Sequence, residues 1–494
     1  MPRLFGACIA AGLLAIGTGG CSPQVQTVYA PCPESVADDC PAVGVVEASE
    51  TPAPVVAVGE NVPASMVQAS EKIAAHIQSG AINGRAYQRL AEMVDRFGHR
   101  LSGSQALEQA IDWTLLQMKA DQLSNVRREK VMVPHWVRGK ESGAIVGPVR
   151  RPLTLLGLGG TVGTGRRPLR GEVVVVPDLP TLEQRGSQLA GKIVVINQAM
   201  PPYDFEKHET HYGKTVEIRV NGASLAAKHG AKAVLVRSVT AHSLNSPHTG
   251  SLRYQDGVKK IPAAAVTVED ADRLQRMAAR GPVEVELSLG AKTLPDAVSG
   301  NAIGEVRGRE LPDEVVVIGC HIDSWDVGDG ASDDGGGCVM VMEAGRILTE
   351  LGLTPRRTVR VVLFTNEENG LRGAKAYYEA HGKEVHVGAL EADVGAGAPS
   401  GFGITGTPEQ LAELVSYAGL FAPLGAGNLH EGGGGADISP LTKDGVLSLG
   451  LHPDVSHYFD LHHSPADTID KIDPDHLQRN AAAIALMAFV LAER

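Results

Sequence analysis

Histidines and carboxylates that could bind metal ions follow the ends of four predicted strands in the 494-residue chain. Zinc takes imidazole nitrogen and carboxylate oxygen as ligands and keeps open positions in catalytic sites. Two zinc ions about 3.5–4 Å apart would share a bridging carboxylate. The pattern therefore predicts a zinc centre, and its candidate residues in chain order are His321 with Asp323 and Asp333, Glu367 with Glu368, Asp393, and His462 with His463.

The adjacent carboxylates Glu367 and Glu368 favour hydrolysis. Neighbouring side chains on a turn after a strand diverge, so one can bind metal while the other transfers protons. A single carboxylate with a pKa near neutrality can deprotonate the attacking water and then protonate a leaving amine.

The strands that precede these residues alternate with helices in the C-terminal part of the chain. The run Val315 to Ile318 is apolar and β-branched, as in a strand that is covered on both faces. Alternation of this kind predicts an α/β fold with a doubly wound, mostly parallel sheet, whose ligands lie beyond the carboxyl ends of the strands. The elements expected after that strand are helix 338–348, strand 358–364, helix 373–380, strand 387–391, helix 408–419 and helix 474–491.

Residue composition and secondary-structure pattern divide the rest of the chain into segments. Residues 1–21 are typical of a signal peptide, and 22–65 of a flexible linker rich in Pro and Ala. Residues 66–145 and 291–494 are expected to form the domain that carries the zinc centre, with two helices in 69–97, one at 104–122 and strands at 130–136 and 142–145. Short β-rich runs between them predict an inserted domain over 146–290.

The N-terminal segment predicts export to the periplasm or medium, an oxidising compartment. Cys21 followed by Ser22 is also typical of a lipoprotein cleavage site, although Thr18 stands where such sites usually have leucine, so the sequence leaves a lipid anchor at Cys21 open. A disulfide between Cys32 and Cys40 would lie in the linker.

The remaining cysteines and the charge balance carry less information. Cys320 and Cys338 lie in apolar patterns and are interpreted as buried small hydrophobic residues rather than thiolate ligands. Asp326, Asp329 and Asp334 are interpreted as groups that hold the loop. The net charge of −12 argues against a nucleic-acid partner.

Several motifs together resemble those of the co-catalytic zinc exopeptidases, an aminopeptidase family, and within it the carboxypeptidase Q group. Around the predicted site they read HIDSWDVGDGASDDGGG, FTNEENG, EADVGAG and HHSPADT. The resemblance continues through VPHWVRGKES, SPHTG and YQDGVKKIPAAAVTVEDA, so it covers most of the chain after about residue 66. The segment LAGKIVVINQ makes the inserted region resemble a protease-associated domain.

The resemblance implies two zinc ions with Asp333 bridging them. It implies His321 and Glu368 on one ion and Asp393 and His463 on the other, while leaving the assignment of pairs to ions open. His463 is preferred to His462 because the family's histidine precedes an acidic residue by four positions, as His463 precedes Asp467. Glu367 would be the general base and acid, and Asp323 would orient an imidazole from behind the ligands. One departure is Ile438, which follows Asp437 where many relatives have histidine.

The implied activity is hydrolysis of dipeptides or short peptides with a free N-terminus, by a hydroxide that bridges the metals and with Glu367 as base. A homodimer is implied by the resemblance alone. Two alternatives remain open: a one-zinc glutaminyl cyclase, against which the presence of both His321 and Asp393 argues, and a non-catalytic binding or receptor module. Such modules typically lose ligands, and none is lost here.

Overall fold

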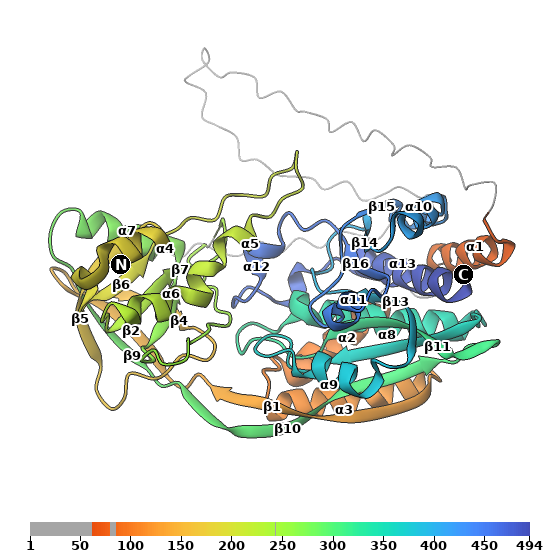
Figure 1. Cartoon of the computed structure of the whole chain (residues 1–494), viewed down its shortest axis with the longest axis horizontal. Coiled ribbons are helices and arrows are strands. Elements are labelled where there is room, and N and C mark those ends of the chain that lie inside the picture. Colours follow the sequence, from red (N-terminus) through yellow and green to blue (C-terminus); the bar gives the residue numbers. More distant parts are fainter. Residues whose placement is uncertain (1–61, 80–84, 243) are drawn as a thin grey trace, which may run out of the picture. The chain divides into compact units, whose positions relative to one another are not determined.

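A computed structural model describes residues 62–79, 85–242 and 244–494. The strands of these residues form two eight-stranded sheets (Figure 1). The predicted signal peptide, most of the linker, Cys21 and the Cys32–Cys40 pair lie outside the described residues. No helix in the described ranges has the length and apolar character needed to cross a membrane.

The first sheet carries the predicted site residues at one edge. Its central strands are parallel, β1 and β10 pair with their neighbours in antiparallel fashion, and β14 is antiparallel to β16 and parallel to β15. In spatial order the strands are β1 (Ser124–Val137), β10 (Lys292–Val306), β12 (Arg357–Phe364), β11 (Leu311–His321), β13 (Val385–Glu391), β16 (Ser448–His452), β14 (Gly401–Thr405) and β15 (Asn428–Glu431).

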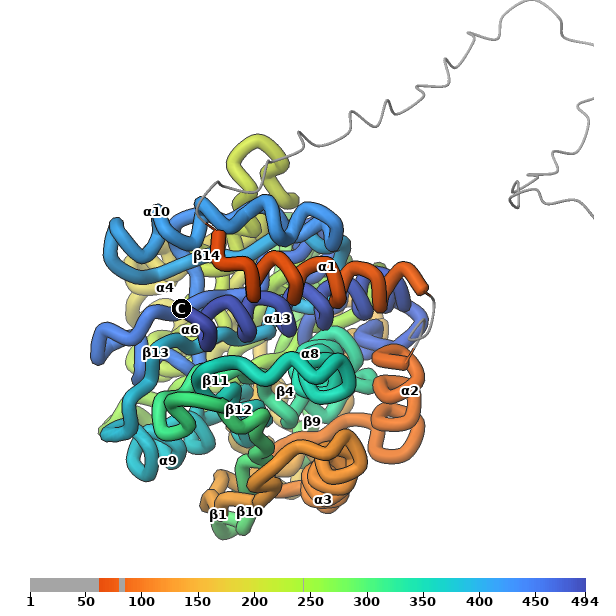
Figure 2. The backbone as a smooth tube through the Cα atoms, turned by 90° about the vertical axis from the view of Figure 1, so that its right-hand side faces the viewer, coloured from red at the N-terminus to blue at the C-terminus, as the bar shows by residue number. Residues whose placement is uncertain are grey.

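Helices cover both faces of this sheet, which explains why β11 is apolar on both sides. Successive side chains of a strand point to opposite faces, and Val316 and Ile318 join one hydrophobic core while Val315 and Val317 join the other. The larger core is built with α1 (Ala64–Gln78), α2 (Arg85–Phe97), α3 (Gln105–Ala120), α8 (Gly336–Glu350) and α13 (Pro474–Glu493), several of which are seen in Figure 2. The smaller one includes α9 (Arg372–His381) and α11 (Ser439–Lys443).

The second sheet is formed by the chain between Glu141 and Leu289. Helices α4 (Leu179–Arg185) and α6 (Glu217–Lys228) pack in one of its cores, and α7 (Val268–Ala278) packs in the other. Its strands in spatial order are β3 (Arg151–Leu153), β2 (Glu141–Gly147), β9 (Glu284–Leu289), β5 (Leu169–Val176), β6 (Ile193–Ile196), β7 (Ala233–Arg237), β8 (Ala263–Val266) and β4 (Leu155–Gly157).

The chain connects the two sheets twice, from β1 to β2 and from β9 to β10, and the two connections lie side by side. β1 pairs with β10 in the first sheet, and β2 pairs with β9 in the second. Between the pairs, the N–H of Gly290 donates to the carbonyl of Lys140 over 2.9 Å. The chain therefore leaves and re-enters the first sheet at the same place.

The alternating elements predicted around the site are present, with ends shifted by a few residues. Two differences concern strands. β10, one of the longest strands of the described chain, was not predicted, because its first half is exposed and mixes apolar and polar residues without alternation. The strand expected at 142–145 is β2, and it lies in the second sheet rather than the first. The boundary at 146 and the likeness of 146–290 to a protease-associated domain stay predictions.

Candidate metal centre

The predicted site residues come together because parallel strands end at one edge of the sheet. His321 is the last residue of β11, and Glu367 and Glu368 follow β12 by a short turn. Asp393 follows β13 in the same way. The loop after α12 (Tyr458–Leu461) brings His463 to the same place from the C-terminal part of the chain.

Two histidine–carboxylate pairs form the centre, and Asp333 lies between them. His321 Nε2 is 3.0 Å from Asp393 Oδ1 and 3.2 Å from Asp333 Oδ1. His463 Nε2 is 3.0 Å from Glu368 Oε2 and 3.2 Å from Asp333 Oδ2. Without an ion between them, His321 thus contacts Asp393, and His463 contacts Glu368. His321, Asp333 and Glu368 also offer ligand atoms within 4.8 Å of one another, so the implied pairing of ligands stays a prediction, with Asp333 in the shared position.

His462 lies close to the centre without occupying an equivalent place. Its Nε2 is 3.7 Å from Asp333 Oδ2, and its ring stacks on that of His463 with centroids 3.5 Å apart. Burial lowers the pKa of His462 well below its usual value, and the neighbouring His463 adds to this effect. The ring therefore packs against the centre as a neutral group.

The pKa shifts of the buried carboxylates and histidines show that the centre favours positive charge. Burial raises the pKa of Glu368 to about 7, although His463 opposes the rise. Burial acts in the opposite sense on the histidines, yet their carboxylate neighbours hold the pKa of His463 at about 9 and that of His321 well above its usual value. The carboxylates thus favour a positive charge, of a proton or of a metal ion, between the ring nitrogens and the carboxylate oxygens.

The donor set fits zinc. Two ligand atoms that each lie about 2.1 Å from a tetrahedral ion are separated by roughly 3.4 Å, close to the nitrogen–oxygen distances observed. Glu368 Oε1 is buried and has no hydrogen-bond partner among the described residues, and Asp333 Oδ2, although 3.2 Å from His463 Nε2, makes no hydrogen bond of suitable geometry. Buried carboxylate oxygens left unsatisfied in this way are expected where a metal ion is to be bound.

Asp323 and Glu367 lie where a positioning group and a base would be needed. The Nδ1–H of His321 donates to the backbone carbonyl of Asp323 over 2.9 Å, which leaves Nε2 to bind metal. The Asp323 carboxylate accepts the backbone N–H of Glu367 at 3.0 Å and the hydroxyl of Ser102 at 3.2 Å. Burial raises the pKa of Glu367 well above its usual value, and the nearby Asp393 carboxylate adds to the rise.

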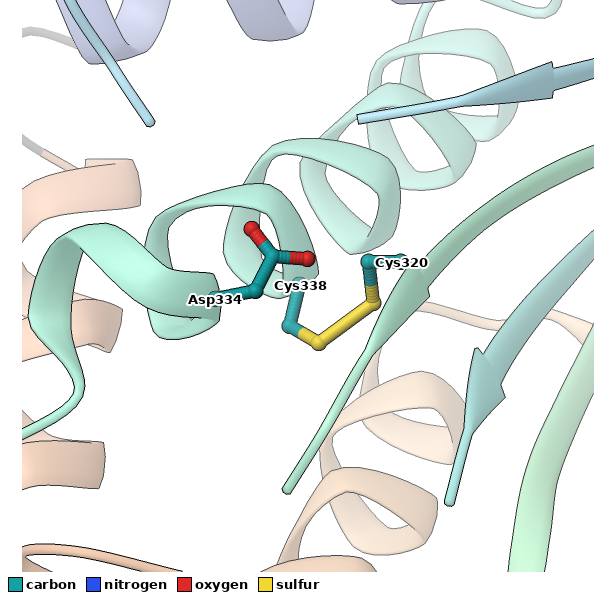
Figure 3. A group of neighbouring side chains, drawn as sticks. All are labelled: Cys320, Asp334 and Cys338. Atoms are coloured by element: carbon teal, nitrogen blue, oxygen red, sulfur yellow. A yellow bond between two sulfur atoms is a disulfide. The ribbon is translucent and has the colours of Figure 1, made fainter. Parts of the chain in front are cut away.

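The loop between β11 and α8 is held by its own carboxylate and by a covalent bond. Asp334 accepts the backbone N–H groups of His321 and Gly337, each at 3.1 Å, as predicted for a group that holds the loop. The interpretation of Cys320 and Cys338 as unpaired thiols is wrong, because they form a disulfide with their Cα atoms 5.2 Å apart (Figure 3). They are buried as expected, and the end of β11 and the first turn of α8 bring them together.

Residues of the segment that forms the second sheet contact the backbone of the loop that carries His463. The N–H of Thr249 donates to the His463 carbonyl over 2.9 Å, and the His248 ring contacts the His462 carbonyl through Nδ1 at 2.7 Å. Both residues belong to the SPHTG motif, which the sequence singled out without giving it a role. Arg219 of α6 also reaches His463, and no sequence signal marked it because it lies inside a helical pattern.

Ile438, which stands where many relatives have histidine, does not line the cavity of the site. Its side chain is buried in the smaller core with Val315 and Tyr377. Its backbone N–H, together with that of Asp437, donates to the carboxylate of Glu391 two residues before Asp393. The segment therefore supports the end of β13 through its backbone, so the identity of the side chain at 438 matters for packing.

Comparison with known proteins agrees with this geometry. Residues 301–488 match the model of peptidase family M28. Carboxypeptidase Q from Mus musculus is 43% identical over 417 residues, covering 84% of this chain and 87% of that protein, and the Homo sapiens protein is 42% identical over the same length.

Solved structures extend the likeness. The crystal structure of a peptidase M28 precursor from Shewanella amazonensis SB2B is 35% identical and superposes with a TM-score of 0.83, covering 87% of this chain and 97% of that one. BSAP, a zinc aminopeptidase from Bacillus subtilis, has the same fold at 20% identity, with a TM-score of 0.62 over 83% of this chain and 94% of its own. The chain therefore belongs to peptidase family M28 and is a zinc metallopeptidase.

Proposed function

We propose that this peptidase is an exported exopeptidase that hydrolyses dipeptides or short peptides with a free N-terminus and holds two zinc ions. The observation that carries the proposal is the symmetric arrangement of His321 with Asp393 and His463 with Glu368 on either side of Asp333. A shared carboxylate between two histidine–carboxylate pairs offers ligands for two ions, and one ion would use only half of them.

The cavity at the centre has the size and lining for a small peptide. Its volume is about 320 Å³, at the lower end of the range typical of ligand pockets. Acidic and imidazole side chains line one part, and Tyr458 and Phe459 supply an aromatic surface. A small cavity with few positions for side chains favours short substrates.

In the proposed reaction the protein's own groups position the substrate and move protons. Zinc held by His321, Asp393, Asp333, Glu368 and His463 would act as a Lewis acid on the scissile carbonyl and on the attacking water.

Glu367 lines the same cavity and carries the carboxylate that accepts a proton from that water and then gives it to the leaving amine. Its raised pKa suits both steps, and Asp323 fixes its backbone.

Replacement of the proposed base provides the test. Glu367→Gln removes the carboxylate without removing a ligand, so zinc content should stay at two ions per chain while kcat on an unblocked dipeptide falls by about 10²–10⁴-fold. Zinc is counted by elemental analysis, and activity is measured on dipeptides with free and acetylated N-termini, with and without chelator. Glu379→Gln, on the exposed side of α9, is the matched control.

If Glu367→Gln kept near wild-type turnover, Glu367 would not be the general base and acid. One zinc per active wild-type chain would instead support the one-zinc alternative. Cleavage of acetylated dipeptides at the same rate as free ones would refute the requirement for a free N-terminus.

A further inference from the structure

Arg219 is a buried cation without a carboxylate partner on the wall of the catalytic cavity. Its side chain lies on α6, is 6% exposed and lines the cavity that contains Glu367 and the proposed ligands. Apart from Arg100, the other buried arginines of the described chain pair with carboxylates: Arg346 with Glu343, for example, at 2.6 Å. No carboxylate of the described residues lies within ion-pair distance of Arg219. A buried guanidinium normally has such a partner, because its desolvation is costly.

Arg100 shows how a guanidinium is satisfied when its role is purely structural. It also lacks an ion pair among the described residues and is fully buried. Its nitrogens donate to four backbone carbonyls, each at 2.9 Å, which belong to Ile322, Gly98, Asp329 and Gly330. These contacts brace the loop after β11, and the charge of Arg100 is spread over carbonyl dipoles.

Arg219 has fewer acceptors. Nη1 donates to the Thr249 carbonyl at 3.2 Å and Nη2 to the Tyr212 hydroxyl at 2.7 Å, whereas Nε has no partner among the described residues. Nη1 also lies 3.4 Å from His463 Nδ1. When the Nε2 of a neutral His463 serves as a ligand, its Nδ1 carries the hydrogen and cannot accept from arginine. Two acceptors then remain for five N–H donors.

The local structure fixes the guanidinium in this place. Gly250 has a φ of +129°, and a Cβ there would lie 2.4 Å from Arg219 Cζ, so the glycine leaves the space that the guanidinium needs. The Tyr212 ring lies 5.6 Å from Cζ and stacks on Phe459 with centroids 4.5 Å apart. The cation is thus held at the cavity wall by residues of the second sheet's part of the chain.

We infer that Arg219, assisted by the hydroxyl of Tyr212, binds the free C-terminal carboxylate of the substrate; this inference rests on the proposed peptidase function. A carboxylate supplies the anion and acceptors that the guanidinium lacks, and arginine binds carboxylates in a forked geometry. The Tyr212 hydroxyl accepts from Arg219, so its own hydrogen can donate to the same carboxylate.

The position of Arg219 also predicts the length of the substrate. It lies next to the outer nitrogen of the His463 ring, whose inner nitrogen faces the reacting centre. One residue of extended chain spans about 3.3–3.6 Å, so the carboxylate of a dipeptide falls near Arg219. Each further residue moves it away by about the same distance. The enzyme should therefore prefer dipeptides to tripeptides and to C-terminal amides.

The test compares alanyl-alanine, its C-terminal amide and trialanine on the zinc-loaded full chain. For the wild type, kcat/KM on the dipeptide should exceed that on the amide by about 10–100-fold, mainly through KM, because the lost contact is a charge-assisted hydrogen bond. In Arg219→Gln the ratio should fall towards one. Arg219→Lys should restore part of it, and Tyr212→Phe should lower it less than Arg219→Gln. Arg170→Gln, at an exposed pair with Glu286, is the control.

A binding measurement separates this inference from the proposed reaction. Calorimetry of an uncleavable dipeptide analogue with a reduced peptide bond, as acid and as amide, reports carboxylate recognition without turnover. Equal binding of acid and amide by the wild type would overturn the role of Arg219, as would an Arg219→Gln variant that weakens both equally. If no unblocked dipeptide is cleaved, the proposed function fails, and the calorimetric comparison still decides the role of Arg219.

Discussion

The two ends of the metal centre are supported in different ways. His321 ends a central strand, and its ring and backbone are held by Asp323 and Asp334 from the residues that follow it in the sequence. His463 lies in a loop with a φ of +60°, where Thr249 donates to its carbonyl and His248 contacts the carbonyl of His462, both from more than 200 positions away. One end is thus part of the first sheet, whereas the other depends on contacts with the chain of the second sheet.

This difference gives the chain between Glu141 and Leu289 a role in building the site. Its SPHTG segment holds the loop of His462 and His463, and its helix α6 contributes a side chain to the cavity. A perturbation on this side should loosen one half of the centre and leave the other half intact. The shared residue Asp333 is the only proposed ligand whose loss should disturb both halves.

The largest effect is expected from Asp333→Asn. The amide keeps the volume but loses the charge that contacts both histidines, so both ions should be lost on dialysis and kcat/KM should fall by more than about 10³-fold. Zinc counted by elemental analysis provides the measurement. Retention of one tightly bound ion would show that the two halves bind metal independently of Asp333.

An intermediate effect is expected from His248→Gln. The change weakens the contact with the His462 carbonyl, and altered support behind a ligand typically costs about 10–100-fold in metal affinity. Competition with a chelator should therefore release one ion early while the second stays as in the wild type. His242→Gln, at an exposed histidine of the same segment, is the matched control.

Early loss of both ions in His248→Gln would contradict the division of the centre into two separately supported ends.

A third effect, on stability rather than on metal binding, concerns acid conditions on the His463 side. Burial lowers the pKa of His248 to about 4, whereas the unfolded chain keeps the ordinary value of about 6.5. Between these values the unfolded state takes up a proton that the folded state refuses, so stability rises with pH from about 4 to 6.5 and is lost as pH falls through that window.

Urea unfolding of the metal-free protein measures this contribution. The wild type should lose on the order of 3 kcal/mol more than His248→Gln between pH 6.5 and pH 4. Parallel pH profiles for the two proteins would show that His248 is not held neutral by its surroundings.

The sequence predicted the candidate site best where its residues come directly after a strand. His321, Glu367, Glu368 and Asp393 could be placed at one edge because parallel strands end together, and the structure does bring them there. His462 and His463 were placed after a predicted strand where the structure has helix α12, and the family resemblance was needed to choose His463. The disulfide of Cys320 and Cys338 was missed since an apolar setting suits a thiol and a disulfide equally well.

The sequence by itself predicted the kinds of candidate ligand, their order and the strands that present most of them, because these depend on local patterns of a few residues. Only the tertiary structure decided which histidine faces which carboxylate, and that Arg219 and His248 stand beside His463. Such contacts join residues far apart in the chain, and no local pattern encodes them. They arise where residues from the chain segments of both sheets line one cavity.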